Sequence, residues 1–276
     1  MTDLWKPQTA APATAGTLWR RHPLDVDSAE AQIARSLAML DAAAAGPALR
    51  WYWAQEPTLI LGVFQAEDLI NRAACAAHGV PVVRRRSGGT GVLAGPPLLS
   101  LDIALPLGHP LALPDVTESY HWLGAAWLAA LRALGVAGAR LVPIAEVRAA
   151  ARPPLRRLPE SGPIPDADLV HLACFGALSP YEVAVGARKL VGFSQIRRRS
   201  GVLLQVGLPL TWQAPLLAGI LAVRAADGPR LEALLRTHAI GLDEVLAPVP
   251  PPATIMAAFE AVLADGWGAR LAAPAD

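Results

Sequence analysis

The segment PVVRRRSGGTGVLAGPPLLSLDIAL, residues 81–105, places a short turn rich in glycine between two runs that favour strands. Residues 81–86, which begin with proline and two valines and end with three arginines, are predicted to form one strand, and the mostly apolar residues 98–105 another. A strand, a glycine loop and a second strand form an arrangement that can hold a ligand against the backbone. This segment therefore predicts both part of a sheet and a place where a ligand could bind.

The loop itself has the chemistry of a binding turn. Gly88, Gly89 and Gly91 can adopt positive φ and approach a bound group closely, while Arg85 supplies positive charge beside them. This combination suits a phosphate, a carboxylate or an acyl carbonyl. The spacing matches neither a P-loop nor a dinucleotide-binding fingerprint, since the GK[ST] ending and the GxGxxG pattern are both absent. A tight turn without a ligand is the alternative.

Helical and strand patterns alternate on both sides of residues 81–105 without a regular βαβ repeat. This favours an α+β fold with mixed β-sheets flanked by helices. Helices are predicted at residues 28–44, 67–78, 117–134, 229–237 and 254–264. Further strands are predicted at 48–53, 58–62, 170–175, 181–185, 190–196 and 202–208, the first two as a hairpin. The first helix is expected to start with a capping box of Asp27 and Glu30. Residues 149–168, rich in proline and arginine, are expected to form a long loop.

The aromatic run from Trp51 to Trp53 is interpreted as core packing, with the wall of an acyl channel as the alternative. The arginine clusters at 84–86 and 197–199 alternate between two faces of their strands. They lack interleaved aromatic residues, so a nucleic-acid surface is the weaker interpretation.

Composition limits the class of protein. The chain has 276 residues, 53% hydrophobic and 17% charged, with a net charge of +1, which excludes a disordered chain and argues against a nucleic-acid or anionic-membrane binder. Residues 1–17 are expected to be a flexible tail and residues 18–276 a single catalytic domain without a C-terminal accessory domain. No signal peptide, membrane span or zinc-like Cys/His spacing is recognised, so we expect a cytoplasmic protein that binds no metal.

Lys189 is the first candidate for chemistry. Only two of the 24 basic side chains are lysines, and the other is Lys6 near the N-terminus. A chain that uses arginine almost everywhere retains lysine where a compact ammonium with three donors is needed. The alternative is a chance lysine on a solvated turn.

The chain has two cysteines, Cys75 and Cys174. A free cysteine is more often an inert buried side chain than a nucleophile. A neighbouring cation would instead favour a nucleophilic role for Cys174, and Lys189 or an arginine could supply that cation. Cys75, in an alanine-rich stretch, is expected to be inert.

Taken together, the motif VRRRSGGTGVL at 83–93 and the motif GARKLVGFSQ at 186–195 resemble those of the lipoate-protein ligase and octanoyltransferase family. The run GVFQ at 62–65 is similar to a third element of that family. The resemblance implies the α+β catalytic-domain fold shared with biotin protein ligases, and a lysine, Lys189, that holds the acyl oxygen. It also implies a set of residues that bind the substrate: Gln65, Arg85, Ser87, Gly88, Gly89, Gly91 and Gly192.

Two mechanisms occur on this scaffold. In the cysteine-dependent octanoyltransferases an acyl thioester passes through an enzyme cysteine, and the run CFGALSPYE at 174–182 resembles that type. The resemblance therefore implies that Cys174 accepts an octanoyl or lipoyl group from an acyl carrier protein and passes it to a lysine of a lipoyl carrier domain, without a cofactor. The alternative is a lipoate-protein ligase that uses ATP and Mg²⁺ to form a lipoyl-adenylate, with Cys174 only packing.

The chain departs from the family pattern in three places. Ala94 and Val206 stand where the family usually has histidines, and the acidic pair of the first helix is replaced near Arg35 and Ser36. A third alternative follows: a non-catalytic paralogue that binds lipoate or octanoate without turnover.

Overall fold

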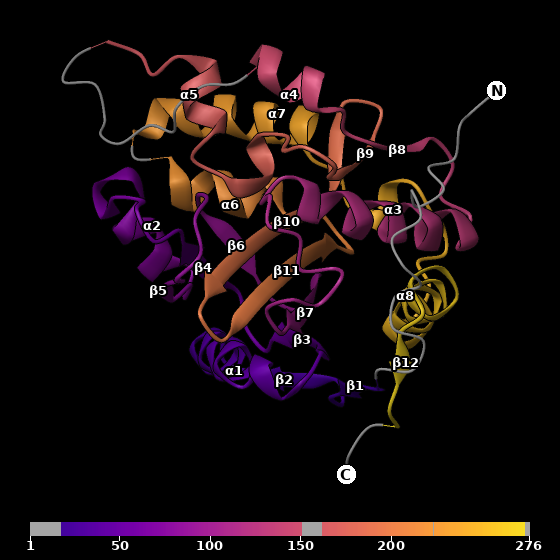
Figure 1. Ribbon diagram of the computed structural model, residues 1–276. Helices are drawn as coiled ribbons and strands as arrows, with labels where there is room; N and C mark the ends of the chain where they lie inside the picture. The colour runs from indigo at the N-terminus through magenta and orange to yellow at the C-terminus, as the bar shows by residue number, and fades with distance from the viewer. Residues whose placement is uncertain (1–17, 151–161, 223, 274–276) are drawn as a thin grey trace.

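The strands of the protein form two sheets (Figure 1). The computed structural model describes residues 18–150, 162–222 and 224–273. The expected tail, 1–17, lies outside the described residues. The strands are β1 (Leu18–Arg21), β2 (Asp25–Asp27), β3 (Ala48–Ala54), β4 (Thr58–Leu61), β5 (Val82–Arg84), β6 (Val92–Ala94), β7 (Leu98–Leu105), β8 (Ala139–Leu141), β9 (Val183–Val185), β10 (Arg188–Arg198), β11 (Gly201–Pro209) and β12 (Arg270–Leu271).

The α-helices cover the sheets on several sides. They are α1 (Ala29–Asp41), α2 (Arg72–Ala77), α3 (Glu118–Ala133), α4 (Ile144–Ala150), α5 (Asp166–Val170), α6 (Ala214–Leu221), α7 (Gly228–His238) and α8 (Pro252–Trp267). Within the described ranges, no helix has the length and apolar character needed to cross a bilayer.

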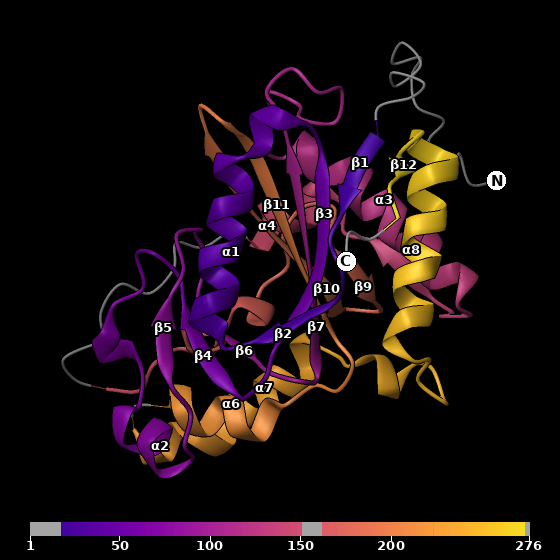
Figure 2. The same cartoon turned by 90° about the horizontal axis from the view of Figure 1, so that it is seen from below.

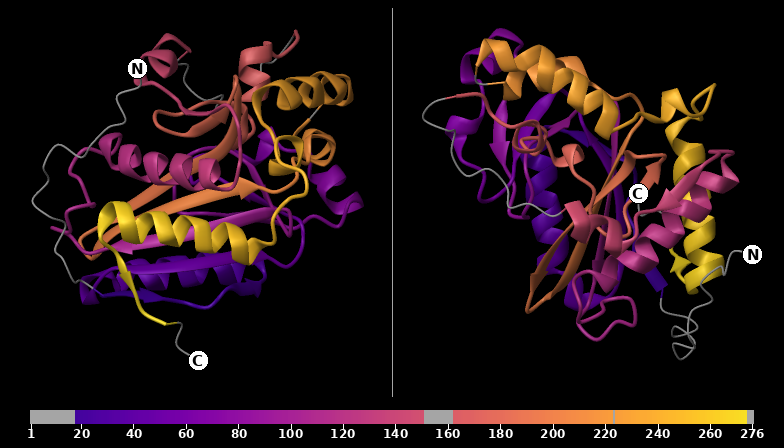
Figure 3. Two further views of the ribbon diagram at one scale, coloured as in Figure 1. Left: turned by 90° about the vertical axis from the view of Figure 1, so that its right-hand side faces the viewer. Right: turned by 90° about the horizontal axis from the view of Figure 1, so that it is seen from above.

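The larger sheet has nine strands in the order β12-β1-β3-β7-β11-β10-β9-β8, with β2 also paired to β3. Successive side chains on a strand point to opposite faces, so each strand serves two layers. Figure 2 shows α1 on one face, and α3 and α8 on the other. Helices α3 and α8 lie side by side against the sheet (Figure 3). On that face Trp51 packs edge-to-face against Trp127 and Phe259, which confirms a core role for part of the aromatic run.

The smaller sheet has the order β5-β4-β6 and carries the glycine loop between β5 and β6. Its core is separate from that of the large sheet and is shared with α2, α6 and α7. The α+β fold with mixed sheets flanked by helices is confirmed.

Three local predictions are wrong. The strands at 48–53 and 58–62 do not form a hairpin, because β3 pairs with β1, β2 and β7 in the large sheet whereas β4 belongs to the small sheet. Residues 170–175 are not a strand. They complete α5 and enter a 3-10 turn at Cys174–Gly176, with one bridge from Ala173 to Gly91. The expected loop at 149–168 contains the start of α5, and its residues 151–161 lie outside the described residues.

The start of the first helix also differs from the expected capping box. Ser28 is the N-cap, and its hydroxyl accepts a hydrogen bond from the Ala31 amide at 3.3 Å. Asp27 lies one residue earlier and accepts from the Ser28 amide at 2.7 Å. The two neighbouring residues both have capping side chains, and the backbone geometry selects the serine.

Candidate active site

The glycine loop holds the segment that carries Cys174. The Cys174 amide donates to the Gly91 carbonyl at 2.7 Å, and the Gly91 amide donates to the Leu172 carbonyl at 3.1 Å. Gln65 adds a third link, since its side-chain nitrogen donates to the same Leu172 carbonyl at 3.1 Å. The glycine loop and the segment at 172–174 are thereby fixed against each other, and the Cys174 side chain lies where they meet.

Close packing of backbone explains two of the glycines. A Cβ on Gly62 would lie 1.7 Å from the Gly89 carbonyl oxygen, so the turn before Gln65 backs directly onto the glycine loop. Gly89 has φ +93°, and a Cβ there would lie 2.6 Å from the Arg85 guanidinium. The loop therefore depends on the absence of side chains at both positions.

We expect Gly62→Ala to displace the glycine loop, because the added methyl group cannot share space with the Gly89 carbonyl. Acyl transfer should fall at least about tenfold, as small misplacements of reacting groups cost this much or more. Gly219→Ala is the matched control, since a Cβ at Gly219 meets nothing within 4 Å. Equal transfer rates in the two variants would show that the loop tolerates the shift.

Arg85 is a cation in contact with the thiol. Its guanidinium donates to the carbonyls of Gly88 at 2.9 Å and Thr90 at 3.1 Å, and it lies 3.8 Å from the Cys174 sulfur. These contacts fix the guanidinium inside the glycine loop. The guanidinium is therefore held in contact with the sulfur.

Lys189 lies inside the protein beside the same cysteine. Its side chain is 1% exposed, and its Nζ lies 2.8 Å from the Glu182 carboxylate and 3.0 Å from the Cys174 carbonyl. Glu182 also accepts from the amides of Ser179 at 2.6 Å and Phe193 at 3.1 Å. Burial raises the pKa of Glu182, while Lys189 and these two amides oppose the rise.

The ion pair changes the electrostatic interpretation of the site. An ammonium has three donors, and two of those on Lys189 are used by Glu182 and the Cys174 carbonyl, which leaves one for a bound group. Glu182 compensates the charge of Lys189. No role for Glu182 is predicted from the sequence. A partner of this kind is expected, because a buried lysine needs a carboxylate to compensate its charge.

Two cavities meet at Cys174. The smaller, about 100 Å³, is mostly apolar, and the larger, about 410 Å³, is bordered by Lys189 and Glu182. Both are bordered by Arg85, Cys174, Phe193 and Ser194.

The predicted site residues divide between these cavities and the structure behind them. Gly88 and Gly89 border the larger cavity, and Gly192 borders the smaller one. Gly91, Ser87 and Gln65 border neither. Ser87 and Gln65 are buried at 2% and 6% exposure and support the loop from behind. Ala94 and Val206 both border the smaller cavity.

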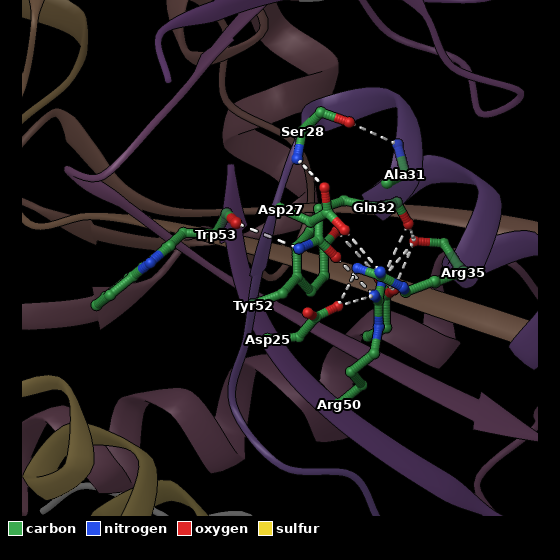
Figure 4. Close-up of polar contacts among 11 residues, drawn as sticks. Asp25, Asp27, Ser28, Ala31, Gln32, Arg35, Arg50, Tyr52 and Trp53 are labelled. Atoms are coloured by element: carbon green, nitrogen blue, oxygen red, sulfur yellow. Dashed lines mark hydrogen bonds and ion pairs between the residues drawn. The ribbon is translucent and has the colours of Figure 1, made fainter. Parts of the chain in front are cut away.

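A buried polar cluster lies under α1, next to the smaller cavity (Figure 4). At its centre Arg50 and Asp102 form an ion pair of 2.9 Å. Ser36 donates to Asp102 at 2.6 Å, and Arg50 donates to the Gln32 side chain at 2.6 Å. Arg35, at the surface, pairs with two aspartates of β2. This cluster holds α1 on the sheet.

No group of three or more His, Cys, Asp or Glu side chains that could bind a metal occurs among the residues that the structure describes.

Comparison with known proteins identifies the fold and the family. The crystal structure of a lipoate-protein ligase A bound with ATP superposes with a TM-score of 0.66 at 15% identity, over 93% of this chain and 88% of that one. A bipartite lipoate protein ligase from Thermoplasma acidophilum superposes with a TM-score of 0.62 at 15% sequence identity. The superposition covers 95% of this chain and 86% of that one. The fold is therefore that of lipoate ligase catalytic domains.

Sequence similarity is more specific. Residues 29–264 match the model of the lipoyl protein ligase A/B catalytic domain. An octanoyltransferase LipM from Exiguobacterium sp. is 30% identical over 257 residues, covering 91% of this chain and 87% of that relative. The chain belongs to the lipoyl protein ligase A/B catalytic-domain family, and it is an acyltransferase of the lipoate and octanoate group.

Proposed function

We propose that the protein transfers an octanoyl group from an acyl carrier thioester to a lysine of a lipoyl carrier domain, with Cys174 as the covalent intermediary. The observation that carries the proposal is the position of the Cys174 thiol, which borders both cavities and lies 3.8 Å from Arg85. The smaller, apolar cavity suits the acyl chain. The larger cavity suits the arm of the donor and then the lysine of the acceptor.

The transfer has two steps. In the first, the Cys174 thiol gives up its proton as its sulfur attacks the thioester carbonyl, the bond from carbon to the carrier sulfur breaks, and the proton ends on the released carrier thiol. In the second, the acceptor amine attacks the enzyme thioester, an amide bond forms, and one amine proton returns to Cys174. Division into two steps lets two bulky carriers use one site in turn.

Lys189 supports both steps from the wall of the larger cavity. Each attack places negative charge on the acyl oxygen, and fixed donors directed at such an oxygen stabilise the transition state. The remaining donor of Lys189 is the group that we assign to this role. Glu182 holds the ammonium in place through the 2.8 Å contact.

The direct test is intact-mass spectrometry after incubation with octanoyl acyl carrier protein. We expect a gain of one octanoyl group, lost on addition of a lipoyl domain, which gains it. The variant Cys174→Ala should show no gain, and Cys75→Ala should behave like the wild type, because Cys75 is buried away from the site. Modification of the lipoyl domain without any enzyme adduct would contradict the thioester route.

A ligase is the second candidate function. The larger cavity also suits a phosphate group, because it is bordered by Arg85, Lys189 and the glycine loop. In that case ATP and Mg²⁺ are required, and lipoate-dependent exchange of pyrophosphate into ATP should be measurable. A cytoplasmic location remains an expectation of the sequence.

We expect Arg85→Leu to slow alkylation of Cys174 by iodoacetamide about tenfold. The reason is that Arg85 is the cation in contact with the sulfur. Arg86→Leu is the matched control, because Arg86 is the neighbouring arginine and is exposed. Peptide mapping separates Cys174 from Cys75, whose burial raises its pKa. An unchanged Cys174 rate in Arg85→Leu would remove Arg85 from this role.

A further inference from the structure

Tyr181, the residue before Glu182, has an unusual backbone conformation. Among the residues that the structure describes, it is the only one other than glycine with a positive φ, at +65°. This left-handed region is disfavoured for a residue with a side chain, because its Cβ crowds the backbone. Strain of this kind persists only where the surroundings hold it, and it is frequent at functional sites. The contacts that hold Tyr181 therefore indicate what the strain achieves.

The strained residue lies in a turn that carries Glu182. The turn spans residues 179–182 and is closed by a hydrogen bond of 3.3 Å from the Glu182 amide to the Ser179 carbonyl. Proline at the second position and a positive φ at the third are features of a type II turn, in which glycine is usual at the third position. The Ser179 amide also donates to the Glu182 carboxylate at 2.6 Å. The turn thus binds the carboxylate of the residue that leaves it.

The same residues form a bulge beside β8. Leu141 on β8 pairs with Val183 on β9. One residue further along, the Tyr181 amide donates to the Val142 carbonyl at 2.8 Å, and the Val142 amide donates to the Glu182 carbonyl at 2.9 Å. Tyr181 and Glu182 therefore lie opposite a single residue, as in a β-bulge with a left-handed first residue, and such bulges redirect side chains. The bulge lies where the Glu182 side chain, 1% exposed, enters the protein.

Helix α3 holds Tyr181 at three points. A Cβ on Gly124 would lie 2.1 Å from the Tyr181 carbonyl oxygen, so the helix touches the peptide that leads to Glu182. The Tyr181 ring stacks on His121 with 4.4 Å between ring centroids, and its hydroxyl donates to Glu118 at 2.9 Å. The three helix residues are spaced by three along α3, so successive members are neighbours on its surface. The ring contacts offset the strain in the backbone.

Glu182 transmits this geometry to the reacting cysteine. Its carboxylate lies 2.8 Å from the Lys189 ammonium, which donates to the Cys174 carbonyl at 3.0 Å. Glu182 and Lys189 border the larger cavity, whereas Tyr181 borders neither of the two cavities that meet at Cys174. A shift of the turn would therefore reach a bound acyl group through Glu182 and Lys189. Shifts of about 1 Å are enough to slow a reaction substantially.

We infer that Tyr181 is a positioning residue: α3 holds it in the left-handed conformation, and that conformation directs the Glu182 carboxylate onto Lys189. The inference rests on the proposed function, because it takes Lys189 as the donor to the acyl oxygen. Tyr181 acts through Glu182 and is not a catalytic residue. Its side chain matters as the means of holding the backbone, so a residue that adopts positive φ unaided should replace it.

The test measures steady-state transfer from octanoyl acyl carrier protein to a lipoyl domain. Tyr181→Ala loses the ring contacts and keeps the strain, so the turn should relax, and kcat should fall at least about tenfold with KM unchanged. Tyr181→Gly loses the same contacts, but glycine adopts positive φ without strain, so its kcat should stay at least about threefold above that of Tyr181→Ala. Tyr181→Phe keeps the ring on His121 and should match the wild type. A residue that only filled space would give the opposite order, with the glycine variant slower than the alanine variant.

A second pair of variants tests the conformation with side chains of nearly equal size. Asparagine enters the left-handed region more readily than leucine, so Tyr181→Asn should be at least about threefold faster than Tyr181→Leu. Alkylation of Cys174 by iodoacetamide controls for general damage to the site. It needs no donor to an acyl oxygen, so its rate should be unchanged in every variant. Each rate is measured well below the unfolding midpoint of the variant.

The failure of the inference differs from the failure of the proposed function. The inference is wrong, and the proposed function stands, if Tyr181→Ala retains the wild-type kcat or if alkylation slows in parallel with transfer. The same conclusion follows if the glycine and asparagine variants are no faster than the alanine and leucine variants. If wild-type Cys174 takes no acyl group from any donor, the proposed function fails and the inference fails with it.

Discussion

Cys174→Ala is expected to lower acyl transfer to a lipoyl domain by at least about 10³-fold, the order of loss seen when a covalent nucleophile is removed. The alanine has no group to carry the acyl chain between the two carriers. The residual rate would come only from direct attack of the acceptor lysine on the donor thioester. The measurement is the steady-state rate with octanoyl acyl carrier protein as donor.

Three controls make this result specific. Far-ultraviolet circular dichroism should be unchanged in Cys174→Ala, because the half-buried side chain is small. Cys75→Ala should retain transfer, since Cys75 lies in a separate core cluster with α2. Cys174→Ser should accumulate no thioester. A Cys174→Ala enzyme with the rate of the wild type would eliminate covalent catalysis and leave the ligase as the candidate.

The second large effect concerns Lys189 and Glu182. We expect Lys189→Met to destabilise the fold by ~3–5 kcal/mol, since it leaves a buried carboxylate without its counter-ion. Glu182→Leu should destabilise similarly by leaving the ammonium unpaired. The double variant, Lys189→Met with Glu182→Leu, should recover much of the lost stability, because an apolar pair of similar volume often replaces a buried ion pair at little cost. Urea denaturation measures all three.

Activity should not recover with stability. In the double variant the acyl oxygen has lost its fixed donor, and transfer should remain about 10²- to 10³-fold below that of the wild type. Stability and transfer are thereby separated in one protein. A double variant that is both stable and fully active would show that Lys189 serves only to hold the fold together. Arg188→Met is the matched control, because Arg188 is the preceding residue on β10 and pairs with Glu244 at the surface.

The two motifs and the class of the fold could be predicted from the sequence. The strand-loop-strand pattern at 81–105 and the apolar periodicities report local preferences, which depend on neighbours in the chain. Lys189 and Cys174 were found as candidates because their residue types are rare in this chain and carry specific chemistry. The family followed from the order of the two motifs. None of these conclusions required long-range contacts.

Other features depend on pairing between distant segments, which sequence patterns do not encode. The pattern at 48–62 is typical of a hairpin, yet β3 pairs with β7 in the large sheet and β4 pairs with β6 in the small sheet. Both cations reach Cys174: Arg85 contacts its sulfur, and Lys189 donates to its carbonyl.

The sequence by itself determined which residues carry reactive groups and where the backbone must bend, because both are properties of single residues and short runs. Only the tertiary structure decided what those groups meet. Packing against α3 holds Tyr181 in a backbone conformation that favours glycine. Burial brings Glu182 to Lys189. Distances between such residues are set by sheet pairing and packing, and these emerge only when the whole chain folds.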